Sequence, residues 1–168
     1  MKRLIWVACL ALAAGAVEEV ELKRFPIESL DGVITRDGVR LDKAATVDGN
    51  GSLELKARHP TTFRLFETGD VDAEEAVLIY RAKMKTRKVK GDAYLEMWCH
   101  FPGGGEYFSR GLQYSLSGTN HWLTVETKFL LRKGENPDNV RLNVVIDGTG
   151  KVWIDDIRLL KAPLPPDL

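Results

Sequence analysis

Four side chains that could recognise a sugar alternate along residues 93–101. Tyr94, Glu96, Trp98 and His100 occupy every second position, so in a β-strand they share one face. Aromatic rings stack on the apolar face of a pyranose, and carboxylate and imidazole groups hydrogen-bond to its hydroxyls. Arginine and asparagine on neighbouring strands would complete such a face. The predicted ligand-binding residues are Tyr94, Glu96, Trp98, His100, Arg81, Arg141 and Asn143, with Lys83 as a further neighbour.

The same aromatic residues also fit a purely structural role. Tyrosine and tryptophan are favoured in strands, where they pack against cross-strand neighbours. Tyr94 and Trp98 could serve this purpose on an outer sheet, or lie beneath the loop of residues 102–116. The sequence leaves both interpretations open.

Two adjacent carboxylates interrupt the apolar segment near the C-terminus. A glycine turn at residues 148–150 leads into a β-branched and aromatic run that contains Asp155 and Asp156. A buried charge without a partner is costly, so such a carboxylate requires a cation, a metal ion or several backbone N–H groups. Strict alternation predicts a shared face for Trp153, Asp155, Ile157 and Leu159.

The elements that must position these residues are short strands. Alternation of apolar and polar residues is clearest at 76–86, 93–101 and 139–147, and Asp-Gly and Gly-rich turns separate the segments. No window has a helical period long enough for a major helix. About ten short strands of this kind predict an all-β, two-sheet antiparallel β-sandwich.

The N-terminus has the pattern of a secretory signal peptide. Lys2 and Arg3 precede an apolar run over residues 4–12, and Ala14 and Ala16 form an A-x-A cleavage site. The run is shorter than the roughly 20 residues that span a bilayer. We expect a secreted or periplasmic protein without a membrane span after cleavage. The predicted organisation is a signal peptide (1–16), an N-terminal arm or first strand (17–27), a β-sandwich domain (28–161) and a C-terminal tail (162–168).

Charge and residue content favour neither nucleic-acid binding nor catalysis. The chain has 24 basic and 24 acidic residues, so nucleic acid has no electrostatic attraction to it. The histidines lack metal-binding spacing, and the sequence contains no nucleophile motif. Cys99 alternates onto an apolar face and is interpreted as a buried small side chain. We expect a non-catalytic protein that is a monomer.

The segments 52–56, 80–86, 117–126, 140–143 and 150–159, in this order, resemble the galactose-binding-like jelly rolls. This fold includes many carbohydrate-binding modules of secreted glycoside hydrolases. The resemblance covers residues 28–161 and implies a jelly-roll β-sandwich with an aromatic sheet face or loop rim that binds oligo- or polysaccharide. A structural or protein-interaction β-sandwich of the cell envelope is the alternative.

The resemblance also implies a structural calcium ion. Members of this group often hold Ca²⁺ near the sandwich edge through a carboxylate of the last strand. The matching position is Asp155, or Asp156 if the register shifts by one, and Glu28 and Asp31 are further candidates. Calcium requires six to eight oxygen ligands, so these carboxylates would form only part of the shell.

Overall fold

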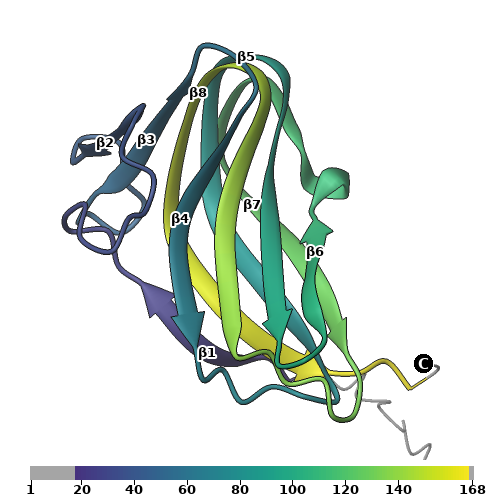
Figure 1. The fold of residues 1–168 in the computed structure, drawn as a ribbon. Coiled ribbons are helices and arrows are strands. Elements are labelled where there is room, and N and C mark those ends of the chain that lie inside the picture. Colours follow the sequence, from purple (N-terminus) through teal and green to yellow (C-terminus); the bar gives the residue numbers. More distant parts are fainter. Residues whose placement is uncertain (1–17, 167–168) are drawn as a thin grey trace, which may run out of the picture.

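The computed structural model describes residues 18–166, which form an all-β fold (Figure 1). The predicted signal peptide, residues 1–16, lies outside this range. No helix among the described residues is long and apolar enough to cross a membrane. The helical segment in this range is the 3-10 turn η1 (Leu112–Tyr114). The strands are β1 (Val20–Phe25), β2 (Val39–Asp42), β3 (Ser52–Ala57), β4 (Thr61–Gly69), β5 (Ala76–Phe101), β6 (Gly105–Arg110), β7 (Leu116–Leu131) and β8 (Asn139–Pro163).

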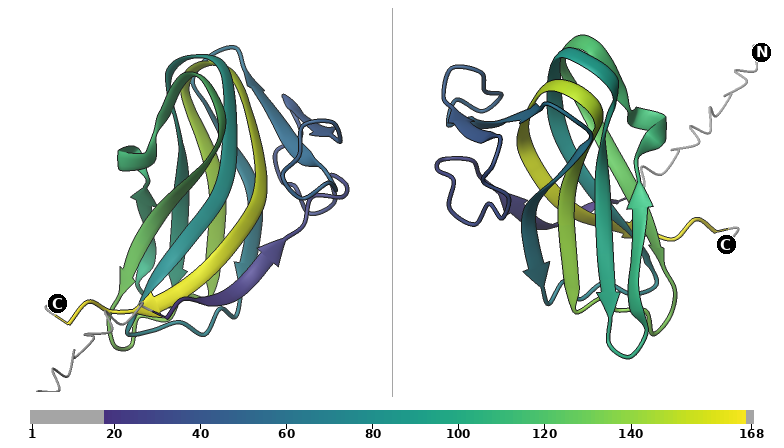
Figure 2. Two further views of the ribbon diagram at one scale, coloured as in Figure 1. Left: turned by 180° about the vertical axis from the view of Figure 1, so that it is seen from behind. Right: turned by 45° about the horizontal axis from the view of Figure 1, so that its top comes forward.

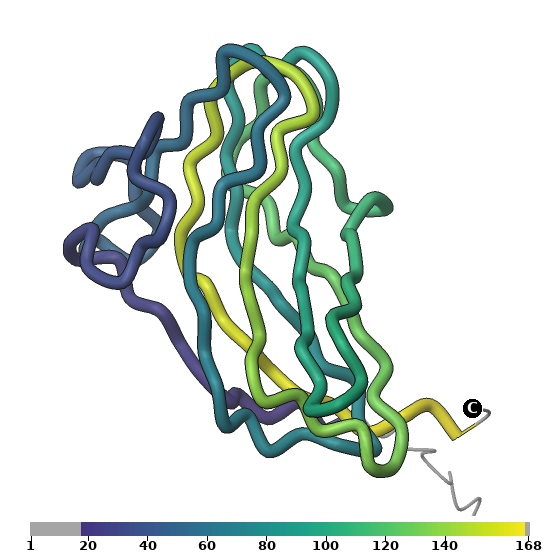
Figure 3. The backbone as a smooth tube through the Cα atoms, viewed as in Figure 1, coloured from purple at the N-terminus to yellow at the C-terminus, as the bar shows by residue number. Residues whose placement is uncertain are grey.

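Strands β5 and β8 organise the molecule because each belongs to both layers of the sandwich. They pair antiparallel from Ala76↔Pro163 to His100↔Asn139. In Figure 3 the backbone tubes of both strands bend over at the top of the sandwich and continue into the other layer. Gly91 of β5 faces Gly148 of β8 in this ladder. A Cβ atom on Gly148 would lie 1.8 Å from the carbonyl oxygen of Lys90, so only glycine fits this close approach.

Two antiparallel layers result, as the views in Figure 2 show. The β4–β6 layer contains β4, the first half of β8, the second half of β5 and β6. The β2–β7 layer contains β2, β3, the second half of β8, the first half of β5 and β7. Strand β1 pairs with the same edge of β8 as β3, but further along. The fold is therefore a two-layer antiparallel β-sandwich, as the sequence predicted.

The predicted alternation places the core correctly. The buried inner positions of the three best-patterned segments join one apolar cluster between the layers. Burial raises the pKa of the Cys99 thiol to about 12, so this cysteine is an inert core residue rather than a nucleophile. These inner positions are Leu78, Tyr80, Ala82, Met84, Ala93, Leu95, Met97, Cys99, Val140, Leu142, Val144 and Ile146.

Two expectations about the last strand were wrong. Residues 148–150 do not reverse the chain, because β8 continues through them as one strand that changes layer. Asp156 has a positive φ of 51°, and the single residue of β5 between Arg81 and Lys83 faces two residues of β8, Asp156 and Ile157. This β-bulge reverses the alternation, so Ile157 joins Ile154 in the core while Trp153 lies outside the main cluster.

Candidate ligand-binding surfaces

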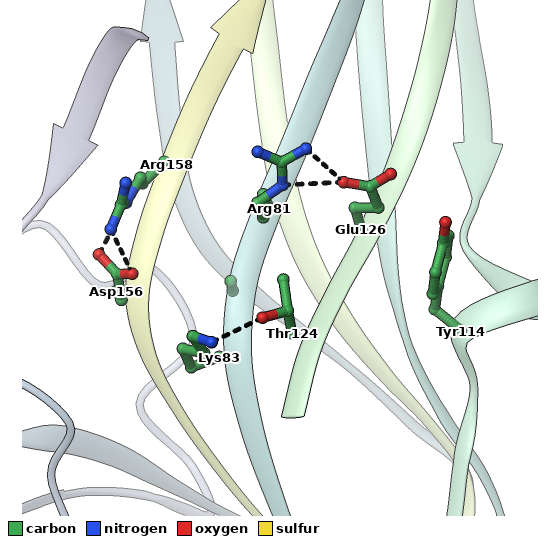
Figure 4. A pocket seen from close by; sticks show the side chains of 8 residues that line it. Arg81, Lys83, Tyr114, Thr124, Glu126, Asp156 and Arg158 are labelled. Carbon is green, nitrogen blue, oxygen red and sulfur yellow. Dashed lines mark hydrogen bonds and ion pairs between the residues drawn. The ribbon is translucent and has the colours of Figure 1, made fainter. Parts of the chain in front are cut away.

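A hollow of about 470 Å³ lies on the outer surface of the β2–β7 layer (Figure 4). Its floor consists of side chains from three adjacent strands, β8, β5 and β7, and its rim includes Tyr114 of η1. We call it the Arg81 hollow. Its lining residues are Arg81, Ala82, Lys83, Tyr114, Thr124, Glu126, Asp156 and Arg158.

Ion pairs fix the polar groups of the Arg81 hollow in place. Arg81 donates to Glu126 through Nε at 2.8 Å, and to the two carboxylate oxygens of Glu19 through Nη1 at 2.6 Å and Nη2 at 2.9 Å. Arg158 donates to Asp156 through Nε at 2.8 Å and Nη2 at 2.5 Å. These bidentate contacts hold planar groups at defined angles, which reduces the conformational entropy lost when a ligand binds.

The carboxylate of Glu126 stays ionised in this setting. Burial raises its pKa, but the hydrogen bonds from Lys128 and Arg81 outweigh burial and hold the pKa below the ordinary value. Hydrogen bonding to Glu19 and Glu126 in turn raises the pKa of Arg81. The Arg81 hollow therefore offers both fixed acceptors and fixed donors at neutral pH.

Tyr114 supplies an aromatic ring at the rim. Its side chain is 39% exposed, and Figure 4 places it across Glu126 from Arg81. The turn that carries it is anchored by Gly111, whose N–H donates to Leu95 O at 2.9 Å. A Cβ atom on Gly111 would lie 2.4 Å from the carbonyl oxygen of Glu126, so glycine is required for this approach.

The face predicted around Trp98 is assembled on the outer surface of the β4–β6 layer. Cross-strand neighbours pair Trp98 with Arg141 and Glu96 with Asn143, as the sequence suggested. His100 Nδ1 lies 2.5 Å from Asp138 Oδ1. The structure thus brings six of the seven predicted residues together, namely Tyr94, Glu96, Trp98, His100, Arg141 and Asn143.

Internal partners occupy much of this face. Glu96 is 3% exposed and accepts from Trp98 Nε1 at 2.8 Å and Arg110 Nε at 2.8 Å. Asn143 Nδ2 donates to it as well, at 3.1 Å. The Trp98 ring packs on Phe108, with ring centroids 4.9 Å apart. Glu96 therefore has little capacity left for a ligand, whereas Trp98 and Phe108 keep partly exposed rings.

Arg81 does not belong to the Trp98 face. The first half of β5, which carries Arg81 and Lys83, lies in the β2–β7 layer, whereas Trp98 lies beyond the bend at Gly91 in the other layer. The prediction that Arg81 neighbours Trp98 was wrong because it treated residues 76–86 and 93–101 as adjacent strands of one sheet. They are two halves of one bent strand.

Sequence reasoning missed most of the Arg81 hollow. Thr124, Glu126 and Arg158 were not singled out, although Thr124 and Glu126 are two positions apart and would share one face of a strand. The missing information was the pairing of β7 and β8 with the two edges of β5. Asp156, which the resemblance suggested as a metal ligand, lines this hollow because of the bulge.

Asp155 has protein partners for both carboxylate oxygens. It is 1% exposed, and its Oδ2 accepts from Val47 N at 2.7 Å and Thr46 Oγ1 at 3.2 Å. Its Oδ1 accepts from Asp156 N at 2.6 Å. Backbone N–H groups are one of the three partner types that the sequence left open.

The other predicted calcium ligands do not converge on Asp155. Asp156 pairs with Arg24 and Arg158, and Glu28 lies exposed on the segment after β1. Residues 18–166 contain no group of three or more His, Cys, Asp or Glu side chains arranged for a metal ion. The calcium site stays a prediction.

Comparisons with known proteins place the fold. No protein-family model and no curated protein sequence matches the chain. Among solved structures, the CBM22-1 xylan-binding domain of Paenibacillus barcinonensis Xyn10C is 16% identical, with a TM-score of 0.61 over 91% of this chain and 100% of that domain. A family 30 carbohydrate-binding module of a Clostridium thermocellum cellulosomal cellulase is 18% identical, with a TM-score of 0.52 over 85% of this chain and 97% of that one.

A third similar structure contains a bound sugar. The CBM22-1 and GH10 modules of Clostridium thermocellum xylanase 10B, complexed with xylohexaose, are 12% identical with a TM-score of 0.61. The match covers 83% of this chain but 28% of the xylanase chain. At these identities the likeness concerns the fold alone. The chain folds as a jelly-roll β-sandwich, the fold of these carbohydrate-binding modules.

Proposed function

We propose that this protein is a secreted or periplasmic, non-catalytic carbohydrate-binding module that holds an oligo- or polysaccharide in the Arg81 hollow. The observation that carries the proposal is the set of charged groups on three adjacent strands, fixed by ion pairs beside an exposed tyrosine ring. Sugar sites need this combination of preoriented hydrogen-bonding groups and an aromatic platform.

Several features support this choice of surface. The Arg81 hollow crosses the middle of a sheet, so an extended chain could lie along it, and Tyr114 would stack at its rim. The side chains of Arg81, Glu126, Asp156 and Arg158 are partly exposed on the floor of the hollow, so a ligand can reach them. Similarity to the fold of xylan-binding domains adds support at the level of ligand class.

The Trp98 face is the second candidate surface for the same ligand class. The partly exposed, packed rings of Trp98 and Phe108 favour it. The buried state of Glu96 and its three internal donors argue against it. A single set of variants separates the two surfaces.

The test is affinity gel electrophoresis and a glycan array with the purified chain. We expect Tyr114→Ala to weaken binding about tenfold, because stacking on one aromatic ring is worth on the order of 1 kcal/mol or more. Tyr107→Ala is the matched control, since Tyr107 is 56% exposed but lies on β6, away from the Arg81 hollow. Trp98→Ala tests the second surface.

Each outcome has a defined meaning. Loss of binding in Tyr114→Ala but not in Trp98→Ala supports the Arg81 hollow. The opposite pattern moves the site to the Trp98 face. If the parent chain binds no glycan on the array or in the gels, the carbohydrate-binding proposal is wrong. The alternative, a structural or protein-interaction β-sandwich of the cell envelope, then takes its place.

A further inference from the structure

Four cations form a column on the outer surface of β5, the central strand of the β2–β7 layer. Arg81, Lys83, Lys85 and Arg87 occupy alternate positions, while the residues between them point into the core. Alternate residues of a strand are about 6.6 Å apart, so the column runs lengthwise along the sheet. Arg81 and Lys83, at one end of this column, belong to the floor of the Arg81 hollow.

Only the first cation of the column is neutralised by the described residues. Arg81 pairs with Glu19 and Glu126. The other three cations, Lys83, Lys85 and Arg87, make no ion pair within residues 18–166. We call these three residues, without Arg81, the basic column. The nearest acids of the hollow are engaged elsewhere, Glu126 with Arg81 and Lys128 and Asp156 with Arg24 and Arg158.

Uncharged neighbours hold the two lysines over the sheet. Lys83 Nζ donates to Thr124 Oγ1 at 2.6 Å. Lys85 Nζ lies 5.5 Å from the centre of the Trp153 ring, within cation–π range. The indole of Trp153 is itself fixed, because its Nε1 donates to Asp42 Oδ2 at 2.9 Å. Both ammonium groups are therefore positioned without being neutralised.

The positive charge of the basic column is a local feature of β5 and does not reflect an excess of basic residues in the chain. The protein has equal numbers of basic and acidic residues, so three uncompensated cations in a row on one strand mark a specific place. An anion that binds to a half-buried cation without a counter-charge gains more free energy than one that binds to a fully solvated cation, because water screens the half-buried charge less.

We propose that the basic column selects polysaccharides that carry acidic groups, with an anionic substituent on the sugar chain placed against Lys83 and Lys85. The proposal rests on the sugar-binding role of the Arg81 hollow and specifies its ligand class. Carboxylates of uronic acids and sulfate esters share the required chemistry. Lysine presents a point charge that accepts either group.

The experiment compares charged and neutral glycans on the purified chain at low and high salt. The probes are polygalacturonic acid, dextran sulfate and neutral arabinoxylan, with poly-L-glutamate as an anion that is not a sugar. The test variant is Lys83→Gln/Lys85→Gln. The matched control is Lys43→Gln/Lys133→Gln, which removes the same charge from two exposed lysines outside the column. Thermal melts of both variants check the fold.

We expect the parent chain to prefer an acidic glycan, and the test variant to lose about fivefold in affinity per lysine at low salt. Sodium chloride at about 0.5 M should remove the preference for acidic glycans, because attraction between exposed charges then extends over only a few ångströms. Neutral arabinoxylan should be affected little by the lysine changes. Whichever of polygalacturonic acid and dextran sulfate binds more tightly identifies carboxylate or sulfate as the preferred group.

The contrary outcomes are distinct. Equal affinity of parent and test variant for the acidic glycans, with neutral glycan still bound, overturns the acidic selection and leaves the sugar-binding role intact. Equal binding of poly-L-glutamate shows a general anion surface and also overturns it. Absence of binding to every sugar probe overturns the sugar-binding role and the selection together.

Discussion

The carboxylate of Asp155 lies 2.7 Å from the backbone nitrogen of Val47, a residue 108 positions earlier in the chain. Thr46 donates its hydroxyl to the same oxygen. Asp155 stands in the gap between β3, which pairs with β8 up to Ile154, and β1, which pairs from Ile157 onwards. One side chain thus ties the loop between β2 and β3 to the last strand where no strand pairing does so.

Replacing this carboxylate should therefore destabilise the domain. We expect Asp155→Ala to lower the free energy of unfolding by about 2–4 kcal/mol, because it leaves buried N–H groups without acceptors. Urea titration followed by tryptophan fluorescence measures the change. Asp37→Ala, at an exposed aspartate, should change stability by no more than about 0.5 kcal/mol. A similar small effect for Asp155→Ala would show that the contact does not hold the loop.

The calcium prediction is tested on the same residue. If Asp155 contributes to a calcium site, the Tm should rise when calcium is added and fall in EGTA, and Asp155→Asn should abolish the difference. Elemental analysis of the dialysed protein gives an independent reading. An identical Tm in calcium and EGTA, with no calcium in the protein, contradicts the site and leaves the N–H groups as the carboxylate's partners.

The bend shared by β5 and β8 should tolerate no side chain. Gly148→Ala would place a Cβ atom 1.8 Å from Lys90 O, and we expect a loss of more than about 3 kcal/mol of unfolding free energy or failure to fold. Gly118→Ala is the control, because its φ is also positive but no atom lies within 4 Å of its added Cβ. That change should cost only about 1 kcal/mol. Comparable losses in both variants would mean that backbone strain, and not the close approach, explains the glycine.

Glu96 should make stability depend on pH. Burial raises its pKa, but hydrogen bonds from Arg110, Trp98 and Asn143 outweigh burial and hold the pKa below the ordinary value of 4.5. A carboxyl with a lowered pKa in the folded state contributes stability above pH 4.5, and this contribution is lost as the pH falls through the folded pKa.

Urea unfolding between pH 7 and pH 3 checks the Glu96 prediction. Glu96→Gln should be less stable than the parent at pH 7, and the gap should narrow as the pH falls below 4.5. Glu28→Gln, at an exposed position, should follow the parent curve throughout. A gap that stays constant with pH would show that Glu96 acts by packing rather than by charge.

Alternation predicted the sandwich and its core because side-chain burial follows a period of two along each strand. The inward positions of residues 93–101 and 139–147 are the ones expected from the sequence. The bulge at Asp156 was not predictable in this way. A positive φ at one aspartate depends on the pairing of β8 with β5, and that pairing is not visible in the spacing of apolar residues.

The two candidate sites differ in the same way: one follows from local alternation, and the other depends on strand pairing. Trp98, Glu96 and His100 share a local segment, so their common face followed directly from alternation. Arg81, Glu126 and Asp156 meet only because three strands from distant parts of the chain lie side by side. The bend at Gly91 further separated Arg81 from the face to which it had been assigned.

The long ladder between β5 and β8 has a consequence for how the chain folds. Its outermost pair joins Ala76 to Pro163, and even its innermost pair, His100 with Asn139, encloses all of β6, η1 and β7. Such pairs form only after long loops have closed, so folding should proceed in milliseconds to seconds rather than microseconds. Because β8 pairs with β1, β3, β4 and β5, the sandwich cannot assemble until β8 has been synthesised.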